Sequence, residues 1–379
     1  MYDLHAHLTG SITGESLFSM IYDSGLYKTA KDKINFLTEP IGMRLADAIC
    51  KDADSAKSRF SKLYVCRPNG TQRFNEIMQR FVLISYVLES DKNMQKTAGE
   101  IVGKDMEEAG TNYVEWRIDP FSSTKNQTAD EGAKKLREFN EGLKKSSLQF
   151  RFVIGLAKHR YKNSSGVDNK KINFAAEQTR MLLDSCEDLP IVGLDAVNKE
   201  DVAIHDLKPF FSLSESYNLG LSPHTGECTS DSLEENLETV TDALTLGADR
   251  LGHAIVSYMP FEGYLGKKDA HGKTYDKARI TALIKRQETV LQAIKDSGVA
   301  IEVCPTSNIV AHLGLKSIKD HPIDRLLDMG IPFVLCTDDY GIFGSPLKKE
   351  INELCKAKNL DKRKLEAAAE KYSFKNFRN

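Results

Sequence analysis

The stretch YDLHAH, residues 2–7, is the first of eight short runs that read as β-strands buried on both faces. Longer segments with helical spacing separate these runs, as in DSLEENLETVTDALTL at 231–246. Alternating strands and helices predict repeated βα units, and eight units predict an α/β fold of the (β/α)8 TIM-barrel type. The other seven predicted strands are 112–118, 148–156, 191–195, 220–224, 250–253, 300–304 and 332–337.

Two segments are longer than a minimal βα unit requires. Residues 9–110 have room for several extra helices after the first strand, and residues 257–277 form a long loop, rich in Gly and Lys, after the sixth. Both would lie at the carboxyl ends of the strands, where barrel enzymes have their active sites. We therefore treat them as lid candidates, although a plain surface loop fits the composition equally well. No internal repeat divides the chain, so 1–379 is predicted to be a single barrel domain.

Composition narrows the functional class. The chain has 379 residues, 41% of them hydrophobic, and 52 basic against 54 acidic side chains give a net charge of -2. This balance offers no basic field for nucleic acid, and the longest apolar run, 81–88, is too short to span a membrane. Seven cysteines without a C-x-x-C pair, and no apolar leader after Met1, favour a cytoplasmic protein with reduced thiols.

Polar side chains collect where predicted strands end. His5 and His7 are two apart on the first strand and so point to one face. His224 ends the fifth strand, His253 the sixth, and the pair Asp338-Asp339 follows the eighth. Two histidines alone would more often be structural residues of a barrel. Three imidazoles and one carboxylate at one barrel mouth, however, suit zinc, so we predict one Zn²⁺ per chain.

A zinc site would supply chemistry as well as structure. Zinc lowers the pKa of a bound water to ~7, which makes a hydroxide available near neutral pH. Glu227 lies three residues after His224 in the turn H-T-G-E, within reach of such a water, and suits a general acid/base. The alternative is a solvated carboxylate at the start of the next helix, where acidic residues are favoured.

Five sequence blocks together resemble the adenosine deaminase family. They are DLHAHLTGS at 3–11, HTGE at 224–227, LGHA at 251–254, CPTSN at 304–308 and CTDD at 336–339, in the family's order. The resemblance implies a (β/α)8 barrel with one zinc ion. It also implies hydrolytic removal of ammonia from the 6-position of an adenine-type nucleoside, adenosine or 2′-deoxyadenosine, to give the inosine-type product.

The same resemblance implies roles for individual residues. Glu227 would protonate the purine N1 while hydroxide attacks C6, and His253 would orient that hydroxide. Asp339 would hold the base through N7. The implied zinc ligands are His5, His7, His224 and Asp338, the last of which thereby also belongs to the catalytic set.

Departures from the family's pattern concern the substrate. Thr9 stands where adenosine enzymes usually carry an Asp that contacts the ribose 5′-hydroxyl. Asn198 stands where a Gly backbone would meet the purine N3 edge. The block D-D-Y-G at 338–341 is similar to the adenosine-deaminase-like branch, which acts on N6-substituted nucleoside monophosphates. An alternative substrate is therefore a 5′-modified, phosphorylated or N6-substituted adenosine.

The missing acid at position 9 would make a 5′-phosphate less costly to bind. Lysines in the loop after the sixth strand would then be candidates for the phosphate contact, although solvated side chains are the simpler interpretation. They are Lys267, Lys268 and Lys273. The expected partner is a small-molecule purine nucleoside or nucleotide, and the sequence leaves the oligomeric state open.

Two rival classes stay open. Other metal-dependent barrel hydrolases cleave amide or phosphoester bonds, commonly with two metals bridged by a lysine after the fourth strand. Asp195 ends that strand here, which favours one metal. The third possibility is a barrel that binds a purine without turnover, since fold alone never establishes function.

Overall fold

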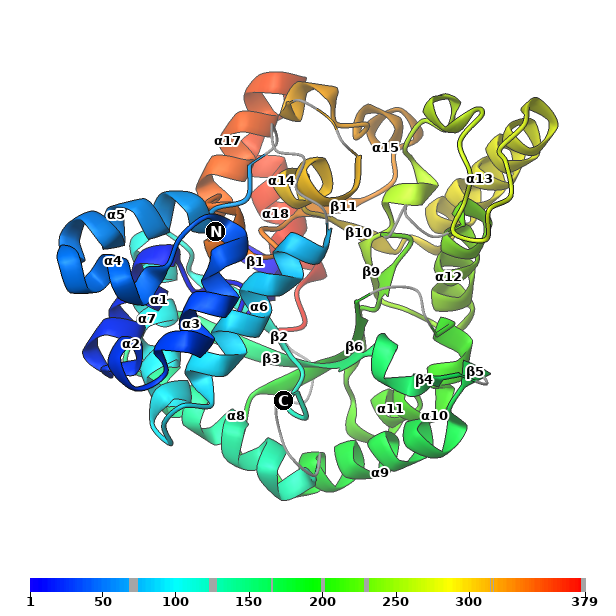
Figure 1. Ribbon diagram of the computed structural model, residues 1–379. Helices are drawn as coiled ribbons and strands as arrows, with labels where there is room; N and C mark the ends of the chain where they lie inside the picture. The colour runs from blue at the N-terminus through cyan, green and yellow to red at the C-terminus, as the bar shows by residue number, and fades with distance from the viewer. Residues whose placement is uncertain are drawn as a thin grey trace.

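Parallel strands form the centre of the protein, and helices surround them (Figure 1). The computed structural model describes residues 1–67, 74–122, 128–164, 166–198, 202–227, 232–313, 315 and 317–375. The barrel strands follow the predicted runs closely, and the first coincides with its prediction. They are β1 (Tyr2–His7), β2 (Tyr113–Ile118), β3 (Gln149–Ala157), β6 (Ile191–Val197), β7 (Gly220–Leu221), β8 (His224–Thr225), β9 (Arg250–His253), β10 (Ala300–Val303) and β11 (Phe333–Leu335).

The barrel wall consists of two parallel sheets, in the orders β1-β2-β3-β6-β7 and β11-β10-β9-β8. At one seam the backbone N–H of His7 donates to the Asp338 carbonyl and the N–H of Asp338 donates to the His5 carbonyl, each across 2.8 Å. At the other seam, β7 and β8 are successive pieces of the predicted strand 220–224. The prediction of one continuous strand there is wrong, because Pro223 lies between the pieces and has no N–H for the ladder. The predicted α/β barrel fold itself is confirmed.

The outer helices form where apolar residues recur at helical spacing. In α12 (Leu233–Thr245), Leu233, Leu237 and Val240 are fully buried, and Ser232 caps the first turn together with Glu235. None of the described helices is long and apolar enough to cross a membrane. The other helices that follow barrel strands are α8 (Ala129–Leu143), α9 (Asn169–Ser185), α10 (Lys208–Phe211), α11 (Leu213–Tyr217), α13 (Lys277–Ser297), α14 (Pro305–Ser307), α15 (Asp324–Met329), α16 (Tyr340–Phe343), α17 (Leu347–Lys358) and α18 (Lys362–Tyr372).

The long segment after β1 folds into the expected extra helices, which gather on one side of the barrel (Figure 1). One of them, α6, lies beside the carboxyl ends of the strands and contributes side chains to the main cavity. The extra helices are α1 (Gly14–Asp23), α2 (Leu26–Thr29), α3 (Lys31–Thr38), α4 (Leu45–Lys51), α5 (Ala53–Tyr64), α6 (Phe74–Leu88) and α7 (Met94–Glu108).

The loop at 257–277, unlike α6, contributes no described residue to the lining of the main cavity. It packs against the outer helices, where Arg279 of α13 pairs with Asp269 across 2.6 Å and His271 lies 3.0 Å from Glu235 of α12. These contacts hold the loop on the flank of the barrel, next to α12 and α13 (Figure 1).

Candidate active site

Four polar side chains converge at the carboxyl ends of the strands. His5 and His7 come from β1, His224 from β8, and Asp338 from the residues after β11. The Nε2 atom of His224 lies 3.1 Å from Nε2 of both His5 and His7. Asp338 Oδ1 lies 3.2 Å from His7 Nε2 and 3.6 Å from His5 Nε2. The structure therefore brings the four sequence-predicted ligands into one cluster, whose ligand atoms all lie within 4.8 Å of one another.

The opposite edges of two of these rings face carboxylates. His5 Nδ1 lies 2.7 Å from Glu302 Oε2, and His224 Nδ1 lies 2.9 Å from Asp195 Oδ2. A carboxylate accepts hydrogen bonds, so each Nδ1 carries a proton, and in its neutral form each ring has a lone pair on Nε2. Two lone pairs 3.1 Å apart repel unless a cation lies between them. The spacings of 3.1–3.6 Å match the edge of about 3.3 Å expected for a tetrahedral zinc site.

Glu302 of β10 anchors the floor of this cluster. Its Oε1 accepts from Arg250 Nε at 2.6 Å and from the Ser222 hydroxyl at 2.7 Å, while Arg117 donates to Oε2. Burial alone would raise the pKa of this carboxyl, but the two guanidinium groups outweigh it and hold the pKa well below its usual range. Glu302 is fully charged and fully buried. Its role was not predicted from the sequence, although an acidic residue inside the apolar run 300–304 is a recognisable signal.

Glu227 and His253 lie beside the cluster. His253 Nε2 is 3.6 Å from Glu227 Oε1 and 3.9 Å from Asp338 Oδ2. Burial lowers the pKa of His253 to about 3, so its ring is neutral at ordinary pH. Ser307, for which the sequence suggested no role, donates its hydroxyl to Asp338 Oδ2 across 2.6 Å and fixes that carboxylate.

Three of these positions have unusual backbone conformations. The φ angles of Asn198, His253 and Asp338 are +72°, +54° and +62°, in the left-handed region that residues with side chains rarely adopt. Such conformations cost of order 1–3 kcal/mol and persist only where the surroundings fix them. At position 198 the positive φ also explains why glycine would suit, and asparagine is among the residues that tolerate it best.

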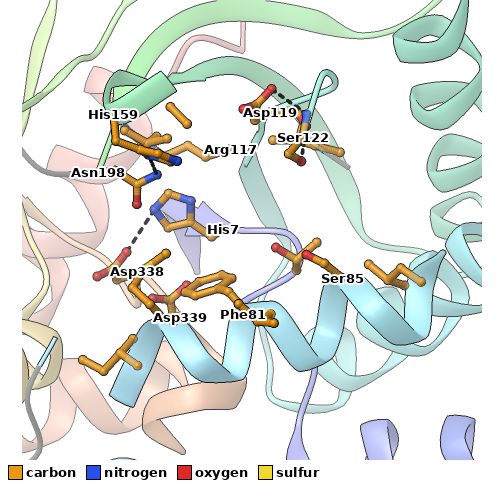
Figure 2. A pocket seen from close by; sticks show the side chains of 18 of the residues that line it. His7, Phe81, Ser85, Arg117, Asp119, Ser122, His159, Asn198, Asp338 and Asp339 are labelled. Atoms are coloured by element: carbon orange, nitrogen blue, oxygen red, sulfur yellow. Dashed lines mark hydrogen bonds and ion pairs between the residues drawn. The ribbon is translucent and has the colours of Figure 1, made fainter. Parts of the chain in front are cut away.

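A cavity of about 610 Å³ opens above the cluster. Its lining includes all three sequence-predicted substrate contacts, Thr9, Asn198 and Asp339. Figure 2 shows Asn198, His7, Asp338 and Asp339 on one side of this space, with Phe81 and Ser85 reaching in from α6. This volume is typical of small-molecule sites.

The Asp339 side chain belongs to the lining of this cavity. Its Oδ1 atom is buried and has no hydrogen-bond partner among the described residues. Burial and the charges of Asp338 and Glu227 raise the pKa of this carboxyl well above its usual value. Gly10 permits the arrangement, since a Cβ there would lie 1.8 Å from Asp339 Oδ1. A buried carboxyl oxygen without a hydrogen-bond partner is expected where a ligand supplies the missing partner.

The loop lysines do not reach this cavity. No residue of 257–277 belongs to its lining in the described parts of the chain, which favours the interpretation of Lys267, Lys268 and Lys273 as solvated side chains and gives the lid hypothesis no support. The loop instead is tied to α12 and α13. The cavity lining includes other basic side chains, namely Lys33, Lys135, His159 and Arg160. Arg160 pairs with Asp119 across 3.2 Å.

Comparison with known proteins gives the family. The adenosine deaminase family model matches residues 51–376. The adenosine deaminase of Enterococcus faecalis is 23% identical over 360 residues, covering 93% of this chain and 84% of that protein.

The structure of the N6-methyl-AMP deaminase from Arabidopsis thaliana has a TM-score of 0.65 at 18% identity, covering 98% of this chain and 91% of its own. A zinc-bound amidohydrolase from Burkholderia ambifaria has a TM-score of 0.67 at 12% identity, covering 98% and 85%. Since the family match spans most of the chain, this protein belongs to the adenosine deaminase family.

Proposed function

We propose that this family member holds one Zn²⁺ on His5, His7, His224 and Asp338 and hydrolytically deaminates an adenine-type nucleoside. The observation that carries the proposal is the pair of Nε2 lone pairs on His5 and His224, 3.1 Å apart, beside the orphaned carboxyl of Asp339. Zinc, when bound, supplies a hydroxide nucleophile near neutral pH. The donor set of three imidazoles and one carboxylate fits this ion.

The surrounding side chains have complementary tasks in this reaction. Glu227 would deliver a proton to N1 of the purine as C6 is attacked, because its carboxyl lines the same cavity as the metal ligands. His253 lies between Glu227 and Asp338, where it would orient the attacking oxygen. Asp339, held by close packing on Gly10, would bind the N7 edge of the base.

The substrate is adenosine or 2′-deoxyadenosine, or an adenosine extended at its 5′ or N6 position. Support for an extended substrate comes from Thr9, an uncharged residue in the lining, and from the basic side chains of the lining, among them Arg160 and Lys33. Arg160 Nη1 contacts Asp119 Oδ2 across 3.2 Å, and a guanidinium group has further N–H donors that a phosphate could accept from.

The direct test is ammonia release by the zinc-loaded protein. The panel comprises adenosine, 2′-deoxyadenosine, adenine, AMP, N6-methyl-AMP and 5′-modified adenosines. Turnover of adenosine or one of its derivatives supports the proposal. Release from a 5′-phosphorylated member at least tenfold above adenosine would select the extended substrate. Purine binding without ammonia from any member would favour the rival role of a silent purine-binding barrel.

A further inference from the structure

Two buried residues, Asn308 and His321, lie on the Nδ1 side of the His253 ring. Asn308 Nδ2 lies 3.2 Å from His253 Nδ1, and Asn308 Oδ1 lies 3.4 Å from His321 Nε2. All three side chains are fully buried. They form a line from His321, through the amide of Asn308, to the ring that faces Glu227.

The amide restricts where the proton of His253 resides. An amide nitrogen donates hydrogen bonds and never accepts them, so His253 Nδ1 must accept from Asn308 Nδ2. A neutral imidazole has one proton, which is then on Nε2. That nitrogen is the one that faces Glu227 and Asp338 across 3.6 and 3.9 Å.

His321 determines which way the amide of Asn308 points. With the amide reversed, its nitrogen would donate to His321 Nε2, and the proton of the neutral His321 ring would have to be on Nδ1. That Nδ1 is buried and has no hydrogen-bond partner within the described ranges. A buried N–H without an acceptor is costlier than an unpaired lone pair, so the proton belongs on Nε2, which donates to Asn308 Oδ1.

Neutrality of the outer ring is consistent with its surroundings. Burial lowers the pKa of His321 to about 3, and the nearby Lys358 ammonium lowers it further while Asp324 opposes this. Tyr258 packs near the ring, with the two centroids 6.1 Å apart. His321 therefore offers a single N–H toward Asn308 throughout the range in which the enzyme would work.

We propose that Asn308 and His321 are positioning residues that hold His253 in its Nε2–H form. In this form His253 donates a hydrogen bond to the attacking oxygen and does not remove a proton from it. The proposal rests on the deaminase function for its catalytic consequence. Its structural content, the location of one proton, stands independently of turnover.

The first test reads that proton directly. Imidazole ¹⁵N chemical shifts are measured on the zinc-loaded full chain with ¹⁵N-labelled histidine, and the His253 signals are assigned by their loss in His253→Gln. The expected result is a protonated Nε2 and an unprotonated Nδ1. A protonated Nδ1, in either a neutral or a doubly protonated ring, overturns the proposal. Because no substrate is needed, this outcome is separable from a failure of the proposed deaminase activity.

The second test compares two replacements of the outer histidine. His321→Gln keeps an N–H that can donate to Asn308, whereas His321→Leu removes it. We expect His321→Leu to lower kcat at least tenfold, the lower end of the range for outer partners of site residues, with KM changed less than threefold and with His253 in mixed tautomers. His321→Gln should regain most of the kcat and the Nε2–H shifts. If both variants and the wild type have equal kcat and equal His253 ¹⁵N shifts, His321 has no part in positioning His253.

Asn308→Asp is a third variant that keeps the test decisive if His321→Leu fails to fold. A carboxylate only accepts, so it should draw the His253 proton onto Nδ1. The expected result is a protonated Nδ1 together with a loss of kcat. Unchanged ¹⁵N shifts in this variant would contradict the proposed control by Asn308.

Discussion

His5 donates from Nδ1 to Glu302 Oε2 across 2.7 Å, at a point where both side chains are fully buried. This hydrogen bond fixes the tautomer of His5 and points its Nε2 atom toward the cluster, in which His7 is a second proposed ligand. Glu302 can hold a full charge there because Arg117 and Arg250 both contact it. The proposed metal site thus depends on a buried carboxylate that is not among the described residues lining the cavity.

Glu302→Gln should weaken this centre without removing any ligand. We expect zinc affinity to fall 10–100-fold, since a partner of a ligand is lost, and stability to fall by about 3–5 kcal/mol because two guanidinium groups lose a buried counter-charge. Competition with a chelator and urea unfolding measure these effects. Glu100→Gln is the matched control, since Glu100 pairs with Lys104 and Lys145 on the surface and should change neither quantity appreciably. Unaltered zinc affinity in Glu302→Gln would contradict the role of the His5 contact.

Glu227→Gln should separate metal binding from catalysis. The amide fills the same space but cannot deliver a proton to N1, so turnover should fall by at least ~10²-fold, while zinc content stays the same. Ammonia release and metal analysis on one sample give both numbers. Retained activity would remove Glu227 from the mechanism, and loss of zinc would mean that it serves the metal site instead.

Thr9→Asp tests whether the cavity is adapted to a 5′-phosphate. A carboxylate at this position would repel a phosphate, so kcat/KM for a monophosphate should fall about tenfold relative to adenosine. Thr9→Asn controls for the change of size without adding charge, and should leave the ratio close to that of the wild type. A ratio that is equally low in both variants, or unchanged in Thr9→Asp, would mean that no phosphate lies near residue 9.

Acid should destabilise the protein through His321. Its pKa is about 3 in the fold against about 6.5 in an unfolded chain, so the unfolded state binds the extra proton between these values. The stabilisation is complete above pH 6.5 and is lost as the pH falls toward 3, at about 1.4 kcal/mol per pH unit. Between pH 6.5 and 5, the free energy of unfolding of the wild type should therefore fall by about 2 kcal/mol more than that of His321→Gln. If urea unfolding shows that the free energies of unfolding of the two proteins change equally between pH 6.5 and 5, the pKa of His321 is not lowered by the fold.

Much of the fold and of the site could be predicted from the sequence. Strands that are buried on both faces can be recognised from the local sequence. The polar residues that end such a strand can be read from the same short stretch, as His5 and His7 are on the first strand. The break in the fifth predicted strand could also have been predicted, because Pro223 has no N–H group to donate to a neighbouring strand. Thr9, Asn198 and Asp339 were placed through motif order, and all three line the cavity.

What could not be predicted depends on three-dimensional pairing. Glu302 acquires its role from Arg117 and Arg250, on two other strands, and nothing local in the chain names these partners. Of the two long insertions, the one that supplies α6 borders the cavity, whereas the lysine-rich loop is held on the flank by Arg279. Length does not distinguish these places, since both segments are longer than a minimal βα unit requires.

The most direct test of the central claim is a zinc titration of the metal-free protein, followed by ammonia release from the most reactive member of the substrate panel. Because a single His3Asp site is proposed to activate the nucleophile, activity should rise in proportion to added zinc and reach its plateau at one ion per chain. His7→Ala should shift this titration to far higher zinc concentrations. Full activity without metal, or a plateau reached only at two ions per chain, would contradict a one-zinc deaminase.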